Sequence, residues 1–152
     1  MNKKSLIISV LVLILIVIGV MYYLQKKNGN DASDFEVTQE EIPKNQNPQG
    51  FESDFPVEAG ATVLQNFEAK TEDGRVQSTK VLSTKNSLTE AVQIYSSYFA
   101  SKGWAEIPSD SSNEENISVV LRKNDDLLLI KGKTNSDNTL TTVEVSLTQA
   151  KL

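Results

Sequence analysis

The sequence predicts an N-terminal transmembrane helix followed by an α+β domain, in which an antiparallel sheet of about five strands carries one helix packed on one face. Three observations lead to this prediction. A long apolar run opens the chain, a polar and acidic segment follows it, and after about residue 56 apolar residues recur with strand and helix periods. The expected organisation is a signal anchor over 1–27, an acidic flexible linker over 28–55 and an extracytoplasmic α+β domain over 56–152, with element order β-β-α-β-β-β.

The apolar run extends over nineteen positions, from Leu6 to Leu24, and is interrupted only by Ser9, Gly19, Tyr22 and Tyr23. A helix of this length rises about 28 Å, close to the hydrocarbon thickness of a bilayer. The run is longer than a secretory h-region, no small-x-small cleavage site follows it, and no early glutamate of the pilin type is present. These residues predict a retained transmembrane helix over about 6–24 rather than a cleaved signal peptide or a buried core helix.

The residues flanking the run bear on its orientation. Lys3 and Lys4 precede it and Lys26 and Lys27 follow it, so the lysine balance is nearly even. Because a chain with only a few residues before its span usually keeps that end inside, we expect a single-pass cell-membrane protein with a cytoplasmic N-terminus and an extracytoplasmic C-terminal domain.

Composition excludes several classes of function. The 152-residue chain contains no cysteine, which removes disulfides, thiol catalysis, thiolate metal sites and lipoprotein processing. It contains no histidine, the usual general base and metal ligand. The net charge of −5 argues against broad nucleic-acid binding. We therefore expect no catalytic, cofactor-binding or metal-binding residues, no cofactor, and no enzyme.

Residues 28–55 are rich in Asn, Asp, Glu, Gln and Pro and have Lys44 as their single cation. Such a segment buries too little apolar surface to offset its ordering entropy, which predicts a solvated spacer. The alternative is an acidic docking peptide for a basic partner. Its possible anchors, which could instead pack onto the domain, are Phe35, Ile42, Phe51 and Phe55.

The domain is expected to open with a β-hairpin. Val63, Phe67 and Ala69 alternate with polar residues and predict one face of a strand. Asp73-Gly74 is a turn signal, and 75–83 is the expected returning strand, although its apolar residues keep no clean face.

A helix from about Leu88 to Lys102 is the best-marked element. Ser87 and Glu90 have the spacing of a capping box. Its apolar positions recur at helical spacing, and Gly103 is placed to end it in the left-handed conformation, with Trp104 folding back on Phe99.

Three further strands are expected, over 117–122, 127–133 and about 142–147, joined by turns at 123–126 and 135–138. Strand 127–133 is apolar at its start on both faces. Short connections predict an antiparallel meander.

Three groups of acidic residues resemble calcium loops, but none has EF-hand spacing, and turn chemistry accounts for them. They are Asp110 with Glu114 and Glu115, Asp125 with Asp126, and Asp137. Asn116-Ile117-Ser118 matches a glycosylation sequon where a strand should begin. An aromatic set could line a binding groove, although helical spacing favours core packing. Its members are Tyr95, Tyr98, Phe99 and Trp104.

The stretch from Pro56 through Trp104 resembles modules of uncharacterised membrane-anchored bacterial proteins. The shared residues are Phe55-Pro56, Gly60-Ala61, Tyr95 and Gly103-Trp104. The resemblance implies an extracytoplasmic α+β domain without an assigned activity and transfers no functional residue.

These observations predict a membrane-tethered, non-enzymatic interaction or accessory module of the bacterial cell envelope, with the membrane and an envelope protein as its partners and no nucleic acid. The alternative is a domain that binds a small ligand or envelope polymer through its aromatic helix edge. A carboxylate-based hydrolase is a remote third possibility, because it needs two acids converging in a cleft. The sequence does not predict an oligomeric state.

Overall fold

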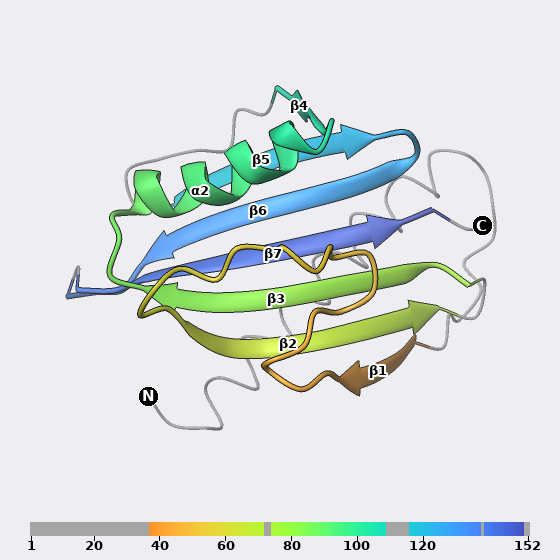
Figure 1. The fold of residues 1–152 in the computed structure, drawn as a ribbon, viewed down its shortest axis with the longest axis horizontal. Coiled ribbons are helices and arrows are strands. Elements are labelled where there is room, and N and C mark those ends of the chain that lie inside the picture. The colour runs from red at the N-terminus through yellow and green to blue at the C-terminus, as the bar shows by residue number, and fades with distance from the viewer. Residues whose placement is uncertain (1–36, 72–73, 109–115, 138, 151–152) are drawn as a thin grey trace. The chain divides into compact units, whose positions relative to one another are not determined.

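The computed structural model describes residues 37–71, 74–108, 116–137 and 139–150. Within these residues one antiparallel sheet has the strand order β1-β2-β3-β7-β6-β5-β4, and one helix lies across it (Figure 1). The elements are β1 Val37–Glu41, β2 Thr62–Thr71, β3 Val76–Thr84, α2 Leu88–Ser101, β4 Ala105–Ile107, β5 Asn116–Lys123, β6 Asp126–Thr134 and β7 Thr141–Gln149.

The prediction of about five strands is wrong, because the sheet has seven within the residues that the structure describes. The two additional strands, β1 and β4, form its edges and are each paired on one side only. All their residues are exposed, so neither strand needs the apolar alternation by which the other five were predicted. The element order is therefore β-β-β-α-β-β-β-β.

Part of the predicted linker belongs to the sheet domain. Residues 37–41 form β1, and the following loop, residues 42–61, lies across one face of the sheet. We call residues 42–61 the covering loop. Phe51 and Phe55 on this loop are buried in the core, as in the alternative that these side chains pack onto the domain. Residues 28–36, including Phe35, lie outside the described residues.

The prediction of a single-pass membrane protein with an extracytoplasmic domain is corrected. Across the part of the chain that the structure describes, no helix has the length and apolar character needed to cross a bilayer. Residues 6–24, on which that prediction depended, lie outside the described residues.

The predicted start and end of the helix are confirmed. The Ser87 hydroxyl accepts a hydrogen bond from the Glu90 backbone N–H, while the Glu90 carboxylate accepts from the Ser87 N–H, which completes a capping box. At the other end Gly103 has φ +85°. The Trp104 N–H donates to the Phe99 carbonyl at 3.1 Å, and the Trp104 ring lies edge-on to that of Phe99.

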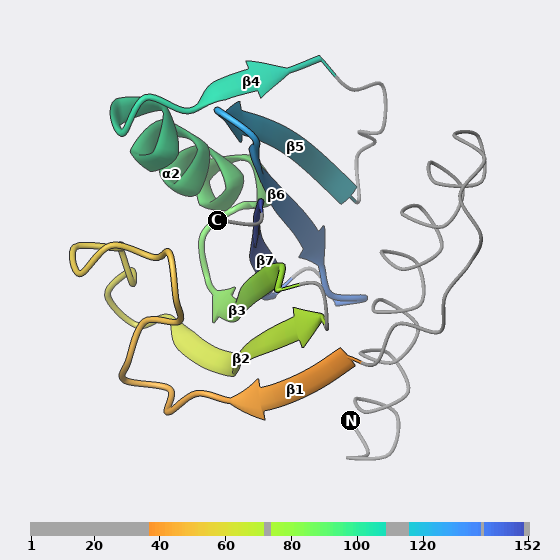
Figure 2. The same cartoon turned by 90° about the vertical axis from the view of Figure 1, so that its right-hand side faces the viewer.

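The helix and the covering loop divide one face of the sheet between them (Figures 1 and 2). We call this the inner face and the opposite one the outer face. The helix packs on β5, β6 and β7. The covering loop is held over β2, because the Asn66 side chain donates to the Pro43 and Gln46 carbonyls and the Gln49 N–H donates to Glu68 Oε1 at 2.6 Å. The core lies beneath both elements.

The side-chain pattern predicted for β2 is wrong at one end. The register shifts between Val63 and Gln65, which indicates a bulge. Val63 pairs with Leu82 and packs against the core, whereas Phe67 pairs with Thr79 and lies on the outer face. The shift separates residues that simple alternation places together.

Candidate functional site

The aromatic set proposed as a groove is part of the core. Tyr95 is 0% exposed, and its ring stacks on that of Phe55 with centroids 5.5 Å apart. Phe51 lies edge-on to Phe55 at 4.9 Å, and Phe55 also contacts Phe99. The covering loop thus closes the space that a ligand would need between these rings. Ligand binding at the aromatic helix edge stays a prediction.

Tyr98 marks the exposed rim of this cluster. Its hydroxyl donates to Asp54 Oδ1 at 2.7 Å, and Lys102 Nζ lies 2.8 Å from both Asp54 Oδ2 and Glu52 Oε2. Burial and the bond to Asp54 raise the pKa of Tyr98 to about 12. The bonds from Lys102 and Tyr98 lower the pKa of Asp54. Since the charges are solvent-exposed, this network is best understood as a tie between the covering loop and α2.

Lys80 is the most deeply buried charged side chain among the described residues, with 1% of its surface exposed. Its Nζ donates to the Gln46 carbonyl at 2.9 Å and to Asn47 Oδ1 at 2.8 Å, and lies 5.6 Å from the centroid of the Phe55 ring. Burial lowers its pKa. A lysine of this kind can act as a nucleophile where substrate reaches it. Here the covering loop seals it, so Lys80 secures the loop to β3.

A partly buried polar cluster lies where β3 leads into α2. Glu58 Oε2 accepts hydrogen bonds from the Thr84 hydroxyl at 2.8 Å and from the Asn86 side-chain amide. The Asn86 carbonyl accepts from the Thr141 hydroxyl. Burial, with the Glu58 carboxylate nearby, raises the pKa of Tyr95. The cluster fixes the second end of the covering loop to the sheet.

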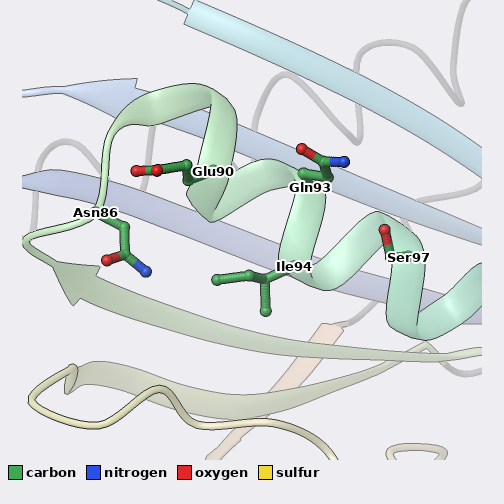
Figure 3. Close-up of a pocket in the computed structure, with 5 residues that line it drawn as sticks. All are labelled: Asn86, Glu90, Gln93, Ile94 and Ser97. Carbon is green, nitrogen blue, oxygen red and sulfur yellow. The ribbon is translucent and has the colours of Figure 1, made fainter.

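Beside this cluster an open hollow of about 460 Å³ runs along α2 (Figure 3). Its lining residues are Asn86, Glu90, Gln93, Ile94 and Ser97. The Glu90 carboxylate belongs to the capping box, and its bonds to Ser87 lower its pKa. The hollow therefore offers amide and hydroxyl groups beside the apolar Ile94 side chain, with its one carboxylate already engaged by the helix cap.

The predicted turn role agrees with the contacts of Asp137, whereas Asp126 is the first residue of β6 and bonds to the end of β7. Asp126 Oδ1 accepts from the Ala150 N–H at 2.8 Å, and Asp137 Oδ1 accepts from the Thr139 hydroxyl at 2.7 Å, which lowers the pKa of Asp137. No three potential metal ligands come together within residues 37–71, 74–108, 116–137 and 139–150. Asp110, Glu114 and Glu115 lie outside these ranges, and Asn116, of the sequon, is the first residue of β5.

Four apolar side chains form a patch on the outer face, where β4, β5 and β6 are neighbours. Ile107 pairs with Val120, and Val120 pairs with Leu129. Paired residues project to the same side of a sheet, and the residues next to them in β5 and β6 face the core. Leu127 extends the patch along β6. We call Ile107, Val120, Leu127 and Leu129 the outer patch; Leu127 is 46% and Ile107 37% exposed.

Three cations border the outer patch, and we call them the basic rim. Lys131 and Lys133 follow Leu129 at two-residue steps on β6, and Arg122 follows Val120 on β5, so all three project outward. Within the described part of the chain neither lysine forms an ion pair. Arg122 Nη2 lies 3.7 Å from Asp125 Oδ1, an exposed contact.

The rest of the outer face has a different character. On β3 and β7 it carries hydrogen-bonded polar side chains: Gln77 Nε2 donates to Ser146 Oγ, and the hydroxyls of Thr79 and Ser146 are 2.9 Å apart. Glu144 on β7 pairs with Lys131 and is 9% exposed. Burial raises the pKa of Glu144, although Lys131 acts in the opposite direction.

The outer patch was not predicted from the sequence, although the sequence contains a signal for it. Val119 and Val120 are consecutive, as are Leu127, Leu128 and Leu129. Successive apolar residues in a strand place apolar side chains on both faces. The second face then needs either a covering element or a partner.

Comparisons of the chain with protein-family models, with curated proteins and with solved structures found no match. The resemblance noted for residues 56–104 stays a prediction.

Proposed function

We propose that this chain is a non-enzymatic interaction module that binds a protein partner through the outer patch. The observation that carries the proposal is the contrast between the two faces of the sheet. The inner face is closed by α2 and the covering loop, whereas no described helix or loop covers β4, β5 and β6 on the outer face.

The exposed area of the patch supports this proposal. Leu127 and Ile107 keep a large part of their apolar surface in water, and Val120 and Leu129 between them are half-buried. Burying such side chains gains about 25 cal/mol per Å² of apolar surface. Clustered apolar side chains with a charged border are typical of protein interaction sites, whereas apolar residues scattered singly are normal on any surface.

Site-specific photo-cross-linking in cells tests the proposal. A photoreactive amino acid is placed at Leu127 in the full chain, and the matched control position is Val57, which is also 46% exposed but lies on the covering loop. We expect a discrete protein adduct from position 127 that is absent from position 57. The adduct should disappear when Ile107 is replaced with glutamate. Equal adducts from both positions, or none from 127, would contradict the proposal.

A further inference from the structure

We infer that the partner segment which occupies the outer patch is acidic and carries apolar side chains, so that its carboxylates contact the basic rim while its apolar groups cover the patch. This inference rests on the proposed function and adds the chemistry of the partner to it.

The arrangement of side chains supports a partner with both kinds of group. The row Ile107, Val120, Leu129 runs across three strands, and strands in a sheet are about 4.8 Å apart. On β6, Lys131 lies two residues beyond Leu129 on the same face of the sheet, and Lys133 lies two residues further. A segment that crosses the strands along the row therefore has apolar contacts beneath it and lysine ammonium groups along one side.

Charge complementarity determines the sign of the charge that the partner should carry. The rim supplies three cations, and two acidic residues adjoin it: the mostly buried Glu144 pairs with Lys131, and the exposed Asp125 contacts Arg122, which leaves Lys133 without an acidic neighbour among the described ion pairs. The chain as a whole has a net charge of −5, so a cationic border is a local departure from its average. Opposite charges across an interface raise the association rate and exclude partners of the wrong sign.

The apolar centre argues for an acidic protein segment over a nucleic acid, which would also match a basic rim. Single strands bind proteins through a continuous basic groove combined with aromatic stacking. The outer patch is aliphatic, and its cations lie at the border. Aliphatic side chains of a peptide fit this centre better than the faces of bases.

The test uses the full chain and three fluorescent ten-residue probes: alternating Glu-Leu, alternating Lys-Leu and alternating Glu-Ser. Binding is followed by fluorescence anisotropy at low and at high salt. We expect Glu-Leu to bind at least about tenfold more tightly than the other two and to weaken as salt increases. Tighter binding of Lys-Leu, or of a single-stranded DNA of equal length, would overturn the inference.

Charge variants locate the binding. Replacing both Lys131 and Lys133 with glutamate should weaken Glu-Leu binding by about tenfold or more, because two attractions become repulsions. K85E, which reverses an exposed lysine before α2, is the matched control and should bind as the native chain does. Arg122→Gln with Lys133→Gln changes two exposed residues and serves if the glutamate variant does not fold. Unchanged binding in a folded rim variant would overturn the inference.

The two proposals fail in distinguishable ways. If the cross-link from position 127 forms and persists in the Lys131→Glu, Lys133→Glu variant, the outer patch binds a partner but that partner is not selected by its acidity. If no protein cross-links at position 127, the proposed function fails and the inference fails with it.

Discussion

Replacing Gly132 with alanine should destabilise the fold, because α2 side chains pack directly against this residue. Gly132 lies on the inner face of β6, between Ile117 on β5 and Val143 on β7. A Cβ atom there would lie 2.5 Å from Val92 Cγ2 and 2.6 Å from Leu88 Cδ1. Both distances are far shorter than a carbon–carbon contact of about 3.5–4.0 Å.

The size of the stability loss in G132A depends on how far the side chains of Val92 and Leu88 can move. Val92 and Leu88 are buried side chains of α2, so they can make space only by moving the helix or leaving their preferred rotamers. Inserting a carbon into a packed core typically costs about 1–3 kcal/mol. For a domain of this size, each kcal/mol lowers the melting temperature by about 4 °C. We therefore expect G132A to melt about 4–12 °C below the native chain.

Urea unfolding of the full chain, followed by circular dichroism, measures this effect as a lower midpoint with an unchanged slope. The control is the double variant with Val92→Ala, which removes one of the two clashing methyl groups. The loss in the double variant should be smaller than the sum of the two single losses by about 1 kcal/mol. A loss below about 0.5 kcal/mol for G132A, or strict additivity, would refute the close approach of α2 to β6.

Three further predictions concern buried or bonded ionisable groups. Glu144→Gln should stabilise the chain by about 1 kcal/mol at pH 7. Burial raises the pKa of Glu144, so its ionised form opposes folding. In urea titrations the stability gained by Glu144→Gln should therefore shrink toward pH 4. Lys80→Met should cost about 1–3 kcal/mol, since two hydrogen bonds from the charged Lys80 ammonium to the covering loop are lost and Asn66 alone still donates to the Gln46 carbonyl; limited proteolysis should then cleave that loop faster. The raised pKa of Tyr98 contributes stability that is complete below pH 10 and is lost as the pH rises to about 12. The melting temperature of Y98F should therefore fall less across this pH range than that of the native chain. An identical fall in melting temperature would argue against the bond from Tyr98 to Asp54.

The elements that could be predicted from sequence are those with local signals. The helix start and end follow from Ser87, Glu90 and Gly103, because capping depends on residues within one turn. The central strands follow from alternation, since each has one face against the core. Edge strands β1 and β4 have no buried face and therefore no such pattern.

The role of residues 42–61 could not be predicted, because it depends on distant contacts. The polar composition of this segment indicates solvent exposure, yet its backbone N–H and carbonyl groups bond to side chains of β2 and β3. Asn66 and Lys80 appear in the sequence as surface residues of strands. They are buried because the loop supplies acceptors for them, and the sequence alone does not show which strand the loop will cover.

The outer patch also could not be predicted from the sequence, because it depends on the order of the strands. Consecutive apolar residues at 127–129 indicate that both faces of a strand are apolar, but alternation does not say which face the helix takes. The strand order places Ile107 and Val120 beside Leu129, and this order is set by pairing between residues far apart in the chain. A surface made by three strands is therefore visible only once the sheet is assembled.

The covering loop also determines where a self-sufficient fragment of this chain can begin. A fragment that starts at Pro56 keeps β2 to β7 and α2 but removes Phe51 and Phe55 from the aromatic cluster and leaves Lys80 without its acceptors. The aromatic rings that become exposed to solvent, and the edge of β2 that has lost β1, favour intermolecular association. Truncation at Pro56 should thus give aggregates, whereas a fragment that starts at Val37 retains the covering-loop contacts described above.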